Sequence, residues 1–321
     1  MDIGVYPNVD VRRGCGWGAA IRTDSQTIDF SINSTAGATH RIQFNVNGER
    51  VGTADTGVTA DSGNRYVKLT FGSSAMRTIE AFFTNSSTIR GFNIAPGATI
   101  QTAPITGDVK SVVLTDSYGV IQNTLRNRNN MYWRMMELLG IPDANVSGSG
   151  GTGWLERGPA KNLGDRGVAD AGRRGPVELI VVGLGINDRN RSPADVRAQV
   201  AATTQALMLA NPRALLFNIM PMWEPQGRTP RSISDAVRMG WDDVADPRRM
   251  GQADPYGLVT GTGRVGSPKG DGNADIFIGD PGNTDGLHPS DNVNLALSGH
   301  YMYGSWAAGK LLEFCHRVTG T

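Results

Sequence analysis

Apolar and polar positions alternate along most of the segment from residue 27 to residue 94. A period of two is typical of strands that bury one face of a sheet and expose the other. Asn47-Gly48 supplies a strong hairpin signal between two of the runs, because both residues tolerate the positive φ of a tight turn. The apolar residues that mark five strands are Ile28, Phe30 and Ile32; Ile42, Phe44 and Val46; Val67, Leu69 and Phe71; Ile79 and Phe83; and Ile89 with Phe92 or Ile94. Short strands without helical stretches predict an all-β sandwich.

The pattern changes near residue 106, where short apolar runs begin to alternate with segments of helical spacing. The runs predict strands at 110–115, 144–147, 177–182 and 215–220, and the helical segments lie at 118–139, 192–210, 232–244 and 291–316. Residues 246–275 are rich in turn formers and give no clear pattern. Because strands that alternate with helices form mostly parallel sheets, this part of the chain predicts an α/β domain.

The chain of 321 residues suits about two domains. We predict a β-sandwich accessory domain at residues 1–105 and an α/β domain at residues 106–321, with 95–105 as a linker or an edge crossing. The formal net charge of +1 gives no overall field that would attract nucleic acid or an anionic membrane, and no apolar run is long enough to span a bilayer. We therefore expect neither partner. The first residues lack the features of a signal peptide, so export by that route is not expected unless a leader has been removed.

Metal and cofactor sites are not predicted. Asp271-Gly272-Asn273-Ala274-Asp275 begins like a calcium loop, but Ile276 stands where the loop needs glycine. Gly148, Gly150 and Gly153 match a dinucleotide-binding spacing, yet no helix follows directly, which favours a loop whose N–H groups face a cleft. Cys15 and Cys315 form no metal-ligand pattern; separate thiols are favoured, and a single disulfide stays open.

Ser117 follows the predicted strand 110–115 at a sharp strand-to-helix turn. A serine at that place is either a helix cap or a nucleophile near N–H groups that favour developing negative charge. Taken alone, Asp116-Ser117 fits the cap better. Asn187 follows the strand 177–182, and the carboxyl ends of parallel strands are where α/β domains bind ligands. Its amide either donates a hydrogen bond into that cleft or belongs to an ordinary β-turn, and taken alone the motif fits the turn better.

Asp285 and His288 stand three residues apart in a turn. An aspartate can hold one imidazole nitrogen and leave the other to accept a proton, although a surface turn with a capping aspartate has the same sequence. The other histidines, His40, His300 and His316, fall in the predicted sandwich and the last helix. His288 is therefore the favoured base.

Taken together in this order, the motifs resemble those of the SGNH hydrolases, a branch of the GDSL esterase and lipase family, over roughly residues 108–316. The nucleophile motif is Thr115-Asp116-Ser117-Tyr118, where the family usually has glycine at the first position. Gly185-Ile186-Asn187-Asp188 and Asp285-Gly286-Leu287-His288 are complete. Ser149-Gly150-Gly151-Thr152 is the loosest match, with Gly150 as the family's glycine and Gly151 as the other choice.

The resemblance implies a flavodoxin-like α/β/α domain after a jelly-roll-like sandwich, and a serine esterase without metal or cofactor. Ser117 would be the nucleophile, His288 the base and Asp285 its partner. The oxyanion would be held by the N–H groups of Ser117 and Gly150 and by the Asn187 amide. Family members with an extra sandwich are often carbohydrate esterases, so the expected substrate is a small ester or an acetylated polysaccharide. The candidate substrate contacts are Asp116, Gly151, Trp154 and Trp223. The tryptophans either stack on sugars or pack in the core or in a lid, and both interpretations stay open.

Two other interpretations remain open. The protein is alternatively a short-chain carboxylesterase with no preference for glycans. It is otherwise a glycan-binding or structural module, such as a phage-tail component, whose hydrolase domain is silent. The complete Ser, Asn, Asp and His set argues against the second of these.

Overall fold

The computed structural model describes residues 4–6, 17–34, 39–52, 56–59, 63–83, 88–103, 109–119, 130–141, 144–158, 161–173, 175–221, 230–255, 258, 289 and 299–320. These residues divide into two compact units near residue 106. None of the described helices has the length and hydrophobicity that crossing a membrane requires.

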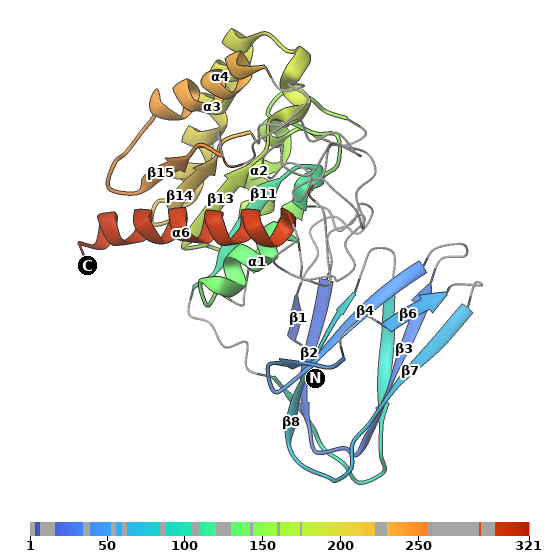
Figure 1. The fold of residues 1–321 in the computed structure, drawn as a ribbon. Coiled ribbons are helices and arrows are strands. Elements are labelled where there is room, and N and C mark those ends of the chain that lie inside the picture. The colour runs from blue at the N-terminus through green and yellow to red at the C-terminus, as the bar shows by residue number, and fades with distance from the viewer. Residues whose placement is uncertain are drawn as a thin grey trace, which may run out of the picture. The chain divides into compact units, whose positions relative to one another are not determined.

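The first unit consists of two antiparallel sheets (Figure 1). One sheet runs β1-β2-β8-β4-β5, with β10 on β2 and β6 on β4, and the other runs β7-β3-β9. The strands are β1 (Gly4–Tyr6), β2 (Trp17–Thr23), β3 (Thr27–Ser34), β4 (Thr39–Val46), β5 (Glu49–Arg50), β6 (Thr56–Thr59), β7 (Gly63–Thr70), β8 (Arg77–Phe83), β9 (Thr88–Ile94) and β10 (Ile100–Thr102). The Phe30 and Phe44 rings, one from each sheet, are 5.1 Å apart, so the two sheets share one core.

The five strands marked by alternation are β3, β4, β7, β8 and β9. Asn47 and Gly48 both have positive φ, 52° and 84°, which confirms the predicted hairpin turn. Residues 95–105 were predicted as a linker or an edge crossing. They are not a plain linker, because β10 pairs with β2 inside the first sheet. β2 was also missed, since Gly18, Ala19 and Ala20 interrupt the alternation of large apolar residues.

The second unit is a parallel sheet of five strands between two layers of helices. The strand order is β12-β11-β13-β14-β15. The strands are β11 (Ser111–Thr115), β12 (Ala144–Gly148), β13 (Leu179–Gly183), β14 (Leu215–Ile219) and β15 (Met250–Ala253), and the helices are α1 (Met131–Leu138), α2 (Leu163–Gly172), α3 (Pro193–Ala210), α4 (Arg231–Asp242) and α6 (Gly299–Thr319). α1 and α6 cover one face, and α2, α3 and α4 cover the other (Figure 1).

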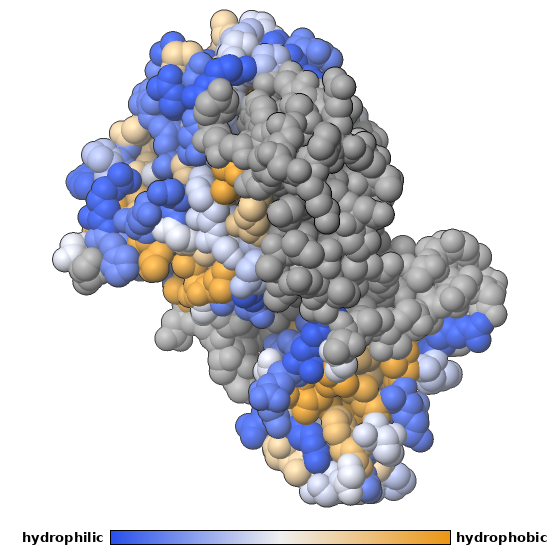
Figure 2. Space-filling view, in the orientation of Figure 1, coloured by the Kyte–Doolittle hydropathy of each residue, from blue (hydrophilic) through white to orange (hydrophobic). Residues whose placement is uncertain are grey.

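β11 shows how the layers form. Val113 packs with the α1 and α6 core, whereas Val112 and Leu114 pack with the core beneath α2, α3 and α4. A strand buried on both faces reads as a continuous apolar run, which is why it was visible in the sequence. The outer surface over α3 and α4 is mainly hydrophilic, as expected for helices that bury only one side (Figure 2).

The helix predicted at 118–139 is only partly tested, because residues 120–129 lie outside the described residues. Ser117–Gly119 is a single 3-10 turn, and α1 begins only at Met131. The Asn130 side chain caps α1 by accepting the N–H of Tyr132 at 3.0 Å, and its own backbone is not helical. α2 and β15 were not predicted, and the predicted start of the last helix at 291–298 lies outside the described residues.

Candidate active site

Ser117 stands where β11 ends, between β12 and β13 and at the carboxyl edge of the parallel sheet. The turn that carries it is tight, since a Cβ on Gly119 would lie 2.0 Å from Cγ2 of Thr115. Ser117 itself is partly exposed, while Asp116 and Tyr118 on either side of it are buried. The turn therefore presents the serine at the edge where α/β domains bind ligands.

Thr115 occupies the position at which the resembled family usually has glycine. Its side chain is fully buried, and its hydroxyl donates to the Gly183 carbonyl at 2.7 Å. The Tyr132 hydroxyl donates to the same carbonyl at 2.9 Å. The threonine that replaces the family's glycine is thus accommodated, because its hydroxyl forms a hydrogen bond that links β11 to β13.

Asp116 is fully buried, so the predicted substrate contact through its side chain is not supported. Its Oδ1 accepts the N–H of Tyr118 at 3.0 Å, which holds the serine turn, and its Oδ2 has no hydrogen-bond partner among the described residues. A small pocket that Tyr132 and Tyr303 also line lies beside this carboxyl. Burial raises the pKa of Asp116 to about 7, although the N–H groups of Tyr118 and Gly185 oppose the rise.

The raised pKa of Asp116 predicts how stability changes with pH. Between its ordinary value of 3.8 and about 7, the folded protein keeps a proton that the unfolded chain releases. The free energy of unfolding should therefore fall as pH rises through this window, by an amount on the order of a few kcal/mol. Asp116→Asn imitates the protonated acid and should remove this fall.

Urea unfolding of both proteins at about pH 5 and about pH 8 measures the effect. The variant should gain stability relative to the wild type at the higher pH. An unchanged difference between the two proteins would show that Asp116 titrates normally.

The glycine loop after β12 lies directly beside Ser117. A Cβ built on Gly150 would be 3.9 Å from Cβ of Ser117, so this glycine is in contact distance of the serine. The N–H of Ser149 donates to the Thr115 carbonyl at 3.2 Å, which fixes the loop to the end of β11. Gly150, one of the two glycines considered, therefore lies beside Ser117.

Asn187 belongs to the 3-10 segment Ile186–Asn190, which follows β13. Its Nδ2 donates to the Thr152 carbonyl at 2.9 Å, and the residue is half-buried. One amide hydrogen is thereby fixed on the glycine loop, which leaves the second available for another acceptor. The residues following β11, β12 and β13 thus come together at one edge of the sheet.

Asp188 connects the segment that carries Asn187 to the chain that follows the glycine loop. The sequence did not indicate this role. Its oxygens accept the N–H groups of Trp154, Leu155 and Glu156 at 2.7, 3.0 and 2.8 Å. Gly153 must be glycine here, because a Cβ would lie 2.2 Å from Oδ2 of Asp188. Burial raises the pKa of Asp188, and the three N–H groups oppose that rise.

The remaining predicted site residues divide into two groups. Asp285, His288 and Trp223 lie outside the described residues. The Trp154 ring is completely buried in the core beneath α2 and α3, so it is not open to stack on a sugar. Gly151 has a φ of 73° and stays a predicted substrate contact.

His300 and Cys315 both lie in the last helix, α6. His300 is buried, and its Nδ1 accepts the N–H of Met131 at the start of α1. Cys315 is a free thiol, while Cys15 lies outside the described residues. Within the described ranges, no group of three or more His, Cys, Asp or Glu side chains could hold a metal ion.

The fold has clear counterparts, although no protein-family model and no curated protein matches the sequence. The salicylyl-acyltransferase SsfX3 from a tetracycline biosynthetic pathway matches with a TM-score of 0.68 at 14% identity, over 94% of this chain and 83% of that one. A family two carbohydrate esterase from Clostridium thermocellum, in complex with cellohexaose, matches with 0.66 at 14%, over 99% of both chains. A GDSL-like lipase from Bacteroides ovatus matches with 0.59 at 13%, over 95% and 85%. The chain therefore has the fold of the SGNH hydrolases, with an all-β unit before the α/β domain.

Proposed function

We propose that this protein is a serine esterase that removes short acyl groups, foremost acetyl, from a polysaccharide. The observation that carries the proposal is the position of Gly150 beside Ser117, together with the bond from the Asn187 amide to the same glycine loop. A nucleophile beside two sources of N–H donors is the arrangement that acyl transfer needs.

In the proposed mechanism, Oγ of Ser117 attacks the ester carbonyl while His288 accepts its proton. Asp285 would orient His288 and stabilise the imidazolium that forms. The oxyanion would be held by the N–H groups of Ser117 and Gly150 and by the Asn187 amide. The alcohol leaves with the proton from His288, and water then hydrolyses the acyl-enzyme. Asp285 and His288 are assigned from the sequence motif alone.

A glycan ester is favoured because a structural counterpart of nearly the same length is a carbohydrate esterase, which was solved with cellohexaose. That counterpart supports the substrate class by analogy only. We further propose that residues 1–105 act as an accessory domain, jelly-roll-like and able to bind glycan, and that residues 106–321 form the catalytic domain. The alternative is a carboxylesterase without preference for glycans.

Acetate release from acetylated xylan and from other acetylated glycans, beside hydrolysis of p-nitrophenyl acetate, tests the proposal. The wild type should release acetate from at least one glycan, and Ser117→Ala should release none. Hydrolysis of p-nitrophenyl acetate without glycan deacetylation would favour the carboxylesterase. Absence of both activities would favour a silent hydrolase domain.

A further inference from the structure

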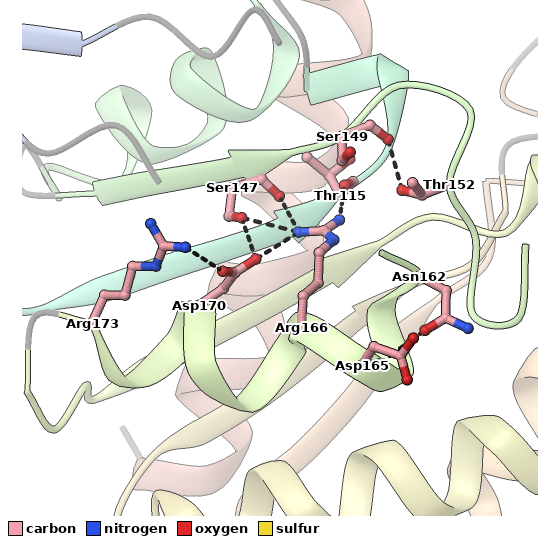
Figure 3. A network of polar contacts seen from close by, with 9 residues as sticks. All are labelled: Thr115, Ser147, Ser149, Thr152, Asn162, Asp165, Arg166, Asp170 and Arg173. Carbon is pink, nitrogen blue, oxygen red and sulfur yellow. Dashed lines mark hydrogen bonds and ion pairs between the residues drawn. The ribbon is translucent and has the colours of Figure 1, made fainter. Parts of the chain in front are cut away.

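A buried ionic network contacts the ends of β11 and β12, the two strands that precede the Ser117 turn and the Gly150 loop (Figure 3). It centres on Arg166 of α2, whose side chain is only 10% exposed, and on Asp170, whose side chain is 6% exposed. Nη1 of Arg166 and Oδ2 of Asp170 are 2.8 Å apart. Arg173 reaches the other oxygen of Asp170 at 3.5 Å.

The guanidinium of Arg166 joins the ends of two strands. Its Nη2 donates to the Thr115 carbonyl of β11 at 2.7 Å. Its Nη1 donates to the carbonyl and the hydroxyl of Ser147 in β12 at 3.3 and 3.0 Å. Figure 3 shows the planar group reaching from α2 to both strands. A planar fork of fixed donors sets the separation of its acceptors more tightly than a flexible ammonium does.

The chain runs directly from these acceptors to the proposed catalytic groups. Ser117 stands two residues after Thr115, and Gly150 stands three residues after Ser147. The Thr115 carbonyl also accepts the N–H of Ser149, so Arg166 and the glycine loop share one acceptor. The Ser147 hydroxyl in turn donates to Asp170 at 2.8 Å, which closes the network.

The packing of the core does not by itself require the charged pair of Arg166 and Asp170 at this position. A buried ion pair is weak evidence for stability, because apolar residues of similar volume often replace it without loss. The positive charge of Arg166 also acts on the site, since it lowers the pKa of Asp116, the neighbour of Ser117, against the effect of burial.

We propose that Arg166, held by Asp170, is a positioning residue that sets the spacing between the Ser117 turn and the Gly150 loop. The inference rests on the proposed esterase function. Removal of the fork should let the two loops drift apart, so that the N–H of Gly150 no longer meets the oxyanion formed at Ser117. Small displacements of catalytic groups can cost on the order of 100-fold in rate.

The test uses two variants of the full chain. Arg166→Lys keeps the charge and loses the fork, and the double variant Arg166→Met, Asp170→Leu replaces the pair with apolar side chains. The matched control is Arg197→Met, which breaks the exposed pair between Arg197 of α3 and Asp243, the residue that caps the C-terminus of α4. For each protein, kcat and KM for p-nitrophenyl acetate are measured per active site titrated with a fluorophosphonate. Hydrogen exchange is followed in peptides that cover residues 115–119 and 148–153.

Arg166→Lys should lower kcat per titrated site about tenfold or more with KM changed less than about twofold, and should speed exchange in both peptides. If the double variant folds, it should show the same changes in kcat, KM and hydrogen exchange. If it does not fold, the result for Arg166→Lys alone decides the test. Unchanged kcat and exchange in Arg166→Lys would overturn the inference. A loss of folded protein with normal kcat per titrated site would also overturn it. A wild type with no esterase activity but faster exchange in Arg166→Lys would instead point to failure of the proposed function alone.

Discussion

Replacing Ser117 with alanine is expected to abolish ester hydrolysis while the fold survives. No other group would form the acyl-enzyme, and loss of a nucleophilic serine typically costs on the order of 10⁶ in kcat. Stability should change little, because Ser117 is partly exposed. Turnover of p-nitrophenyl acetate by purified wild type and variant measures the effect, and circular dichroism checks the fold.

Ser149→Ala is the matched control for that experiment. Ser149 lies in the adjacent glycine loop, and its hydroxyl is buried without a hydrogen-bond partner among the described residues. Its removal should leave most of the activity. If Ser117→Ala keeps substantial turnover, or if Ser149→Ala is the variant that loses it, Ser117 is not the nucleophile.

Asn187→Ala should lower kcat by about 10²–10³, the usual cost of one oxyanion donor. The effect should fall on kcat more than on KM, because the amide would bind the oxyanion more strongly than the ground-state ester. Loss of the 2.9 Å bond to the Thr152 carbonyl should add to it by loosening the glycine loop. Steady-state kinetics with p-nitrophenyl acetate measure both constants.

Asn190→Ala is the control, since Asn190 lies exposed in the same 3-10 segment. It should behave as the wild type does. Turnover within about twofold of the wild type in Asn187→Ala would remove Asn187 from the oxyanion hole.

The fold could be predicted where burial leaves a local pattern. β11, β13 and β14 are buried on both faces and appear in the sequence as apolar runs. Asn47-Gly48 is a residue pair typical of a hairpin turn, so that turn could also be predicted. The sequence pattern does not predict an element that tertiary packing stabilises against its intrinsic propensity. α2 carries glycines inside the helix, which propensity disfavours, but its Leu163 belongs to the same buried core as Val196 and Val200 of α3.

The site could be predicted as far as it follows strand ends. Ser117, Gly150 and Asn187 each come after a predicted strand, and the structure places them at one edge. The roles of Asp188 and Arg166 could not be predicted. They depend on contacts to residues more than thirty and fifty positions away in the sequence, to Trp154 and Thr115 respectively.

Trp154 shows the converse. Its neighbours in the sequence resemble an exposed loop, yet three N–H bonds to Asp188 fold that loop inward and bury the ring. Local composition cannot report a burial that a distant carboxylate causes.

Mass spectrometry of the protein after treatment with a fluorophosphonate tests the central claim most directly. The account predicts one adduct per chain, on the peptide that contains Ser117, and protection of that serine by an excess of ester substrate. An adduct on a different residue, or ester hydrolysis that continues while Ser117 stays unmodified, would contradict it.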